Sequence, residues 1–199
     1  WPENSTAVDP FRDAPTREGI RRAVEAVDTP VLVGAMVDHD DPGKILNQGI
    51  VMDPDTGVGG RYSKRHPVPF GEYVPFRELL PADSNIGRLA EVPRDMVAGQ
   101  RRTPLDVRGV SVADAICFDV SYDDVYVDQV RRGGEVVVVQ TSNAMFIHTS
   151  QIDQQFAITR LRALETGRSV AVAAINGVSG GVGPRGGGGA SGPAREAGG

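Results

Sequence analysis

The strongest candidate for chemistry in this 199-residue chain is its single cysteine, Cys117. A cysteine attacks a carbonyl group only as the thiolate, so it needs a base or a positive neighbour to lose its proton at neutral pH. Cys117 follows the strand-like run 112–116 and precedes Phe118, which is where a strand would end and expose the sulfur. A lone cysteine in such a run is also typical of a small buried hydrophobe, so this residue by itself leaves both interpretations open.

Lys64 is the second candidate, and it stands at the start of a stiff loop. Three prolines, Pro67, Pro69 and Pro75, favour an extended and rigid backbone, which suits side chains that must be held in fixed places. The same loop carries a carboxylate, Glu72. Most lysines are solvated surface charges. Because the chain has only one other lysine, however, the loop context favours a functional interpretation for Lys64.

Glu3 is the third candidate, next to Trp1 and Pro2. Apolar neighbours could desolvate its carboxylate, which would raise its pKa and make it a competent base. The alternative is an exposed terminal acid. Together, a carboxylate, an ammonium and a thiol are the groups that acyl transfer through a thioester requires. The carboxylate takes the thiol proton, the ammonium and a backbone N–H stabilise the oxyanion, and the sulfur holds the acyl group.

The elements that must position these residues alternate between helix and strand. Apolar spacing predicts a helix with Ile20, Val24 and Val27 inward, and another from Ser150 to Gly167 with Ile152, Phe156, Leu161 and Leu164 inward. A capping-box pattern at Ser121 predicts a helix between them. Strands are expected at 31–37, on both sides of the turns 53–57 and 108–109, and at 136–140 and 169–175. This alternation predicts an α/β layered fold.

Two segments interrupt that pattern. Eleven of the 25 glycines lie in residues 177–199, so we expect a domain over residues 1–180 and a Gly-rich tail over residues 181–199, irregular or disordered from about Gly183. Residues 76–102 show little periodicity. A connection of that length is a candidate lid or membrane-facing arm, or else a plain surface loop.

Composition excludes several classes of function. The formal net charge of −5 and the pI near 5.2 argue against a nucleic-acid partner. No apolar run approaches the roughly 18 to 20 residues that a membrane helix needs. One cysteine and three scattered histidines exclude a disulfide framework and match no zinc spacing, so we expect neither metal nor cofactor.

The order of three motifs resembles the nitrilase (carbon–nitrogen hydrolase) superfamily: Trp-Pro-Glu at 1–3, Tyr-Ser-Lys at 62–64 and Ile-Cys-Phe-Asp at 116–119. Residues 64–75 are similar to apolipoprotein N-acyltransferases, whose loop after the catalytic lysine reads Val-Pro-Phe-Gly-Glu-Tyr/Phe-Val-Pro. Segments 140–143, 159–168 and 174–180 agree as well, so the resemblance covers residues 1–180.

The resemblance implies a nitrilase-type α-β-β-α sandwich, with two sheets face to face and helices outside. It implies that Glu3 is the general base, Lys64 the oxyanion stabiliser and Cys117 the nucleophile. The backbone N–H of Phe118 is the implied second oxyanion donor. Glu72 matches a second essential carboxylate that helps to orient the lysine and the base.

Other positions are implied near the pocket. Trp1 and Tyr73 are walls of the site or simple packing residues, and Asn143 belongs to the loop after a Val-rich strand. Here Phe118 and Asp119 replace the Tyr-Glu pair usual in the family, so the acid is shorter. Residues 142–146 also lack the Asp-Ala-Trp form common in that loop.

The implied activity moves a fatty acyl chain from a phospholipid to the N-terminal α-amine of a diacylglyceryl-cysteine lipoprotein, at the extracytoplasmic face of the bacterial plasma membrane. The family has membrane-spanning helices before and after this domain. We therefore expect these 199 residues alone to be inactive or unable to hold lipid substrates. Two alternatives remain: a soluble amidohydrolase with the same three groups, and a degenerate, non-catalytic domain.

Overall fold

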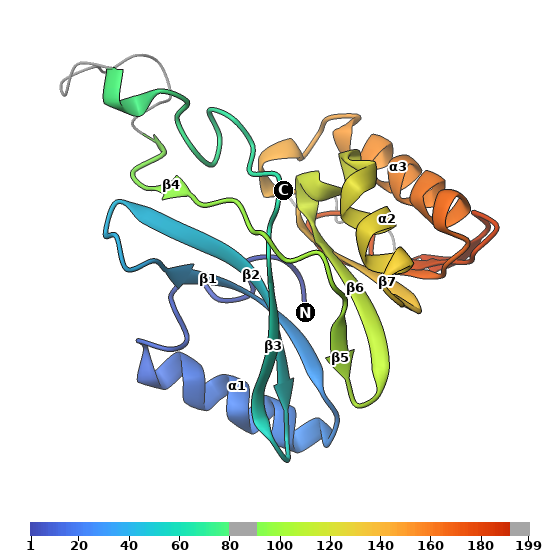
Figure 1. Ribbon diagram of the computed structural model, residues 1–199, viewed down its shortest axis with the longest axis horizontal. Coiled ribbons are helices and arrows are strands. Elements are labelled where there is room, and N and C mark those ends of the chain that lie inside the picture. Colours follow the sequence, from blue (N-terminus) through green and yellow to red (C-terminus); the bar gives the residue numbers. More distant parts are fainter. Residues whose placement is uncertain (80–90, 192–199) are drawn as a thin grey trace.

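The computed structural model describes residues 1–79 and 91–191, which form two β-sheets with helices on their outer faces (Figure 1). The first sheet has the order β1-β2-β3, and β4 pairs with β2. Its strands are β1 (Val31–Asp38), β2 (Lys44–Asp53), β3 (Gly57–Ser63) and β4 (Asp95–Met96). The second sheet has the order β10-β9-β8-β7-β6-β5. Its strands are β5 (Leu105–Val107), β6 (Val110–Ile116), β7 (Val136–Ser142), β8 (Val170–Ile175), β9 (Gly180–Val182) and β10 (Gly188–Ser191).

Helices cover the outer face of each sheet. Helix α1 (Ala14–Val27) packs Ile20 and Val24 against Val33 of the first sheet. Helices α2 (Asp123–Arg131) and α3 (Gln151–Thr166) cover the second sheet, whose β6, β7 and β8 run parallel (Figure 1). Parallel strands need such cover because both of their faces must be shielded from water. The expected α-β-β-α sandwich is confirmed.

The predicted hairpins are present. Strands β2 and β3 pair antiparallel around the turn 54–56, and Gly57 follows it with a positive φ of 79°. Strands β5 and β6 pair around Arg108 and Gly109, where φ is 49° and 84°. Glycine has no Cβ to clash at a positive φ, so Gly57 and Gly109 suit these turns, whereas Arg108 adopts its positive φ with a side chain.

Several inward positions on the helices were predicted wrongly. Val27 of α1 is 57% exposed, and Leu161 and Leu164 of α3 are 56% and 55% exposed. On α3 the buried residues are Thr159 and Ala163, which continue the row from Ile152 and Phe156 at spacings of three and four. Two leucines three residues apart define a different stripe, and only the contact with the sheet decides which stripe faces inward.

The start of one helix differs from the prediction. Helix α2 begins at Asp123 with Tyr122 as its N-cap residue, so Ser121 is not the cap. At α1 the Asp13 carboxylate accepts a hydrogen bond from the backbone N–H of Thr16.

The C-terminal prediction needs a correction as far as Ser191. Strands β9 and β10 pair antiparallel, and the turn between them is closed by a hydrogen bond from the Gly183 N–H to the Gly187 carbonyl. The chain is therefore regular beyond Gly183, and sheet pairing extends past the expected boundary at residue 180, because strand pairing satisfies backbone groups without needing large side chains. Residues 192–199 lie outside the described residues.

Part of the candidate lid, residues 80–90, also lies outside the described residues. Of the remainder of 76–102, Arg77–Leu79 form a short 3₁₀-helix (η1), and β4 pairs with the start of β2. Arg77 forms an ion pair with Asp95 at 2.8 Å. Across the described ranges, no helix combines the length and the apolar character needed to cross a bilayer.

Candidate active site

The first acid of the site, Glu3, is buried between the two sheets, with 3% of its surface exposed. Its Oε1 accepts a hydrogen bond from Asn47 Nδ2 of β2 at 2.7 Å. Its Oε2 accepts one from the backbone N–H of Ser142, at the end of β7, also at 2.7 Å. Glu3 is therefore not an exposed terminal acid, because each oxygen is held by a different sheet.

A glycine makes room for the loop that carries Glu3. A Cβ at Gly34 of β1 would lie 2.1 Å from the carbonyl oxygen of Pro2 and 2.9 Å from the Cα of Glu3. No side chain fits at such distances, so the close approach of the two backbones depends on this glycine.

Lys64 follows the last residue of β3 and is completely buried. Its Nζ lies 2.6 Å from Glu72 Oε1 and 3.4 Å from Glu3 Oε1. Burial alone would lower the pKa of Lys64, but the negative charges of Glu3 and Glu72 raise that pKa above its ordinary value. The lysine is therefore an ammonium held between two carboxylates, and it is not a surface charge.

The proline-rich loop holds Glu72 in place. The second carboxylate oxygen of Glu72 accepts a hydrogen bond from the Val68 N–H at 2.7 Å, and its backbone carbonyl accepts one from the Met96 N–H at 2.8 Å. One carboxylate thus connects the lysine to the loop that follows it, and the orienting role implied for Glu72 stays a prediction.

Cys117 stands directly after β6, at the first position of a 3₁₀-helix (η3, Cys117–Ser121), with a positive φ of 49°. A positive φ is uncommon for a residue with a side chain and often marks a functional position. Burial raises the pKa of Cys117 to about 11, Glu3 adds to that effect, and Lys64 and a hydrogen bond to Thr141 oppose it. The resting group is therefore a neutral thiol, and the charges of Glu3 and Lys64 influence its pKa.

Asp119 joins the cysteine turn to the lysine loop. Its carboxylate accepts hydrogen bonds from Tyr62 Oη at 2.8 Å, from the Ile116 N–H at 3.1 Å and from the His66 N–H at 2.8 Å. A further contact comes from the Arg65 N–H at 3.2 Å. Asp119 is fully buried and connects the segments on both sides of the site, and its role in the pocket stays a prediction.

The remaining predicted positions surround these groups. The ring of Phe118 packs edge-to-face on Tyr122, with centroids 5.3 Å apart. Tyr73 lines a cavity of about 280 Å³ together with Tyr122. Trp1 is 42% exposed, and its carbonyl accepts a hydrogen bond from Gln140 Nε2. The oxyanion role of the Phe118 N–H and the wall roles of Trp1 and Tyr73 stay predictions.

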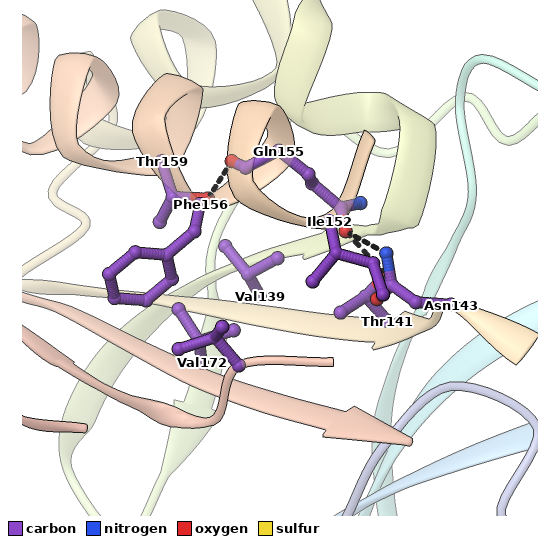
Figure 2. A pocket seen from close by; sticks show the side chains of 9 residues that line it. Val139, Thr141, Asn143, Ile152, Gln155, Phe156, Thr159 and Val172 are labelled. Atoms are coloured by element: carbon purple, nitrogen blue, oxygen red, sulfur yellow. Dashed lines mark hydrogen bonds between the residues drawn. The ribbon is translucent and has the colours of Figure 1, made fainter. Parts of the chain in front are cut away.

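Asn143 is buried and belongs to a polar network beside the sulfur. Its Nδ2 donates a hydrogen bond to Gln155 Oε1 of α3 at 2.7 Å (Figure 2). Gln155 and Thr141 border a cavity of about 10 Å³ between β7 and α3, which is room for about one water molecule and not for an acyl chain.

Sequence reasoning missed Asn47, Ser142, Thr141 and Gln155 as parts of this site. Signals existed for Asn47, a polar residue inside a strand of mainly apolar neighbours, and for Thr141 and Ser142, which lie in the segment 140–143 that agrees with the family. Ser142 contributes through its backbone and Gln155 through the rotation of α3, so local pattern predicts neither contact.

The match to a known family covers nearly the whole chain. The model of the carbon-nitrogen hydrolase family matches residues 1–191. The chain is 34% identical over 190 residues to an apolipoprotein N-acyltransferase of Mycolicibacterium smegmatis, covering 94% of this chain and 31% of that protein. It superposes on a carbon–nitrogen hydrolase of Helicobacter pylori with a TM-score of 0.70 at 14% identity, over 92% of this chain and 64% of the other. For an amidase from Nesterenkonia sp. the TM-score is 0.65 at 20% identity, over 94% and 66%.

Fold and family match together define the class: the chain belongs to the carbon–nitrogen hydrolase family. Within that family, its sequence is similar to apolipoprotein N-acyltransferases, which confirms the resemblance found in the motifs. The chain spans about a third of the length of these curated relatives.

Proposed function

We propose that this chain is the catalytic domain of an acyltransferase that carries the acyl group on Cys117. The observation that carries the proposal is the buried ammonium of Lys64, which lies between Glu3 and Glu72. The charges of all three groups also influence the pKa of Cys117. Burying an ammonium and two carboxylates is costly in free energy, and removing one of them leaves an uncompensated buried charge. Such a cluster is therefore more typical of a reaction site than of a core that serves only for packing.

In the first half-reaction, Glu3 takes the proton of Cys117 as the sulfur attacks the carbonyl carbon of an ester. The Lys64 ammonium and the Phe118 N–H stabilise the oxyanion of the tetrahedral intermediate. The carbon–oxygen bond then breaks, and the leaving alcohol takes the proton that Glu3 holds. A thioester on Cys117 and an alcohol are the products.

In the second half-reaction, a primary amine attacks the thioester carbonyl. Glu3 takes a proton from the amine, the oxyanion forms again beside Lys64, and the carbon–sulfur bond breaks. The proton returns to the sulfur, so the products are an amide and the free thiol. This sequence fits a resting thiol, because Cys117 with a pKa of about 11 needs a base during attack.

For substrates we propose a phospholipid as acyl donor and the α-amine of a diacylglyceryl-cysteine lipoprotein as acceptor, at the extracytoplasmic face of the plasma membrane. The names of the related apolipoprotein N-acyltransferases support this choice. Since the chain spans only about a third of these relatives, we expect it to need further membrane-embedded segments for lipid binding.

The test uses the complete gene product in membranes with a phospholipid that carries a labelled acyl chain. The label should appear on the tryptic peptide of residues 109–131, which contains Cys117, and both Cys117→Ala and Cys117→Ser should abolish it. Label retained on that peptide in either variant contradicts the mechanism.

The acceptor decides between this reaction and a soluble amidohydrolase, in which water replaces the amine. Addition of a diacylglyceryl-cysteine peptide should discharge the labelled thioester and yield N-acylated peptide. Release of free fatty acid only, together with turnover of small amides, would support the amidohydrolase instead.

A further inference from the structure

A glutamine that no part of the proposed reaction uses lies beside the sulfur. Gln155 is in the second turn of α3, and its Nε2 is 3.7 Å from Cys117 Sγ, which is hydrogen-bond distance for sulfur. This amide comes from an element far from the cysteine in sequence. The fold therefore brings a third polar group to the nucleophile, besides the carboxylate and the ammonium.

The orientation of the Gln155 amide is determined by its neighbours. Gln155 Oε1 accepts a hydrogen bond from Asn143 Nδ2 at 2.7 Å and lies 3.2 Å from Thr141 Oγ1 (Figure 2). Because these donors occupy the carbonyl end, the NH₂ end must face the sulfur.

Asn143 is held in turn by the backbone. Its N–H donates to the Ile175 carbonyl at 2.9 Å, and Gly177 packs so closely that a Cβ there would lie 2.6 Å from Asn143 Oδ1. The chain from β8 through Asn143 to Gln155 is therefore preorganised before any substrate binds.

We infer that Gln155 donates an N–H hydrogen bond to the Cys117 sulfur and stabilises the thiolate that forms in both half-reactions. A hydrogen bond to an anion is stronger than one to a neutral thiol or thioester, so the contact favours the charged stage selectively. The charged groups that influence the pKa of the same sulfur are Glu3, Lys64 and Glu72. This role rests on the proposed function, since a thiolate is needed only if Cys117 is the nucleophile.

The experiment measures the reactivity of the Cys117 thiol and needs no acyl donor. The complete gene product is treated with iodoacetamide at pH 8.5, and carbamidomethylation of the 109–131 peptide is followed by mass spectrometry. Gln155→Ala should slow alkylation of Cys117 about tenfold, the effect of losing one hydrogen bond to a charged group. The matched control is Gln154→Ala, an exposed neighbour on the same helix, which should alkylate at the wild-type rate.

A second variant covers the case in which Gln155→Ala does not fold. Gln155→Glu keeps the size of the side chain but places a negative charge beside the sulfur, so alkylation should again be slower than in the wild type. Thermal unfolding identifies misfolded protein, in which a free cysteine with a pKa of about 8.5 would react faster.

Wild-type alkylation rates in folded Gln155→Ala or Gln155→Glu would overturn the inference and leave the acyl-transfer proposal intact. If instead the alkylation effect is seen but the phospholipid label never appears on Cys117, the contact between amide and sulfur stands and the acyltransferase proposal fails.

Discussion

At the scale of single residues, burial and nearby charges together set the pKa values of Lys64 and Cys117. Burial disfavours the charge on Lys64, yet the lysine stays an ammonium because Glu3 and Glu72 surround it. Burial also disfavours a thiolate at Cys117, and there the negative charge of Glu3 adds to the effect. At rest, Lys64 is therefore a permanent ammonium, whereas Cys117 is a neutral thiol.

The lysine can be tested by replacing it with a neutral side chain of similar length. Lys64→Met should abolish thioester formation and lower the free energy of unfolding by about 3 kcal/mol, because it leaves buried carboxylates without their counter-ion. Urea denaturation and acyl labelling measure the two effects. Lys44→Met is the matched control: Lys44 is half-exposed and pairs with Asp41 on the surface at 3.1 Å, so it should change stability by less than about 0.5 kcal/mol.

The thiol gives a prediction about pH. Because the raised pKa of Cys117 is about 11, the thiolate fraction should increase about tenfold for each pH unit between 8 and 10. The rate at which iodoacetamide alkylates Cys117, measured on the 109–131 peptide, should rise in proportion to the thiolate fraction, without a plateau in that range. A plateau near pH 8 would mean that the folded site does not suppress thiolate formation.

At the scale of elements, the site depends on how closely segments approach one another. The loop with Glu3 crosses β1 at Gly34, and the hydrogen bonds from Asn47 and Ser142 then hold the carboxylate. A small backbone shift at this crossing would move Glu3 away from Lys64. Catalysis is sensitive to displacements of that size.

Gly34→Ala should therefore cost both activity and stability, with a loss of about 1–3 kcal/mol from the clash with Pro2. Gly19→Ala provides the contrast, because a Cβ at Gly19 in α1 would have no neighbour within 4 Å. That substitution should leave acyl labelling unchanged and stabilise the helix by about 0.5–1 kcal/mol. Equal thermal stability of the two variants would contradict the close-approach argument.

At the scale of the whole molecule, the interface between the sheets contains polar groups as well as apolar ones. Asp114 of β6 is fully buried, and desolvation raises its pKa to about 8, with the charge of Asp119 adding to that effect. Opposite it lies Gly49 of β2, where a Cβ would be 1.9 Å from Asp114 Oδ2 and 2.6 Å from Gln140 Oε1. Both oxygens thus lie close to the glycine, and burial favours the protonated, uncharged form of Asp114.

Stability should consequently depend on pH through Asp114. Its folded pKa of about 8 exceeds the ordinary value of 3.8, so its contribution is complete below about pH 4 and is lost as the pH rises through about 8. Asp114→Asn has a similar size but cannot ionise. The free energy of unfolding of Asp114→Asn relative to wild type should therefore increase by about 1 kcal/mol per pH unit between pH 5 and 8. Urea unfolding at each pH tests this, and a constant difference would show that Asp114 is already ionised in the fold.

Much of the frame and the main candidate residues could be read from the sequence because their signals are local. Turns at Gly57 and at Arg108 and Gly109 follow from backbone preferences, and the β-branched runs of β1, β7 and β8 identify strands. The order of the Glu3, Lys64 and Cys117 motifs was sufficient to indicate the family.

Tertiary structure alone decided which face of α3 is buried, so that Thr159 and Ala163 point inward while Leu161 and Leu164 do not. It also decided that Gln155 meets the sulfur, that Asn47 and Ser142 hold Glu3, and that Asp119 serves as a connector. These contacts join residues up to 139 positions apart. Local pattern can specify a helix or a strand, but it carries no information on the rotation and approach of elements, which the packing of the complete chain determines.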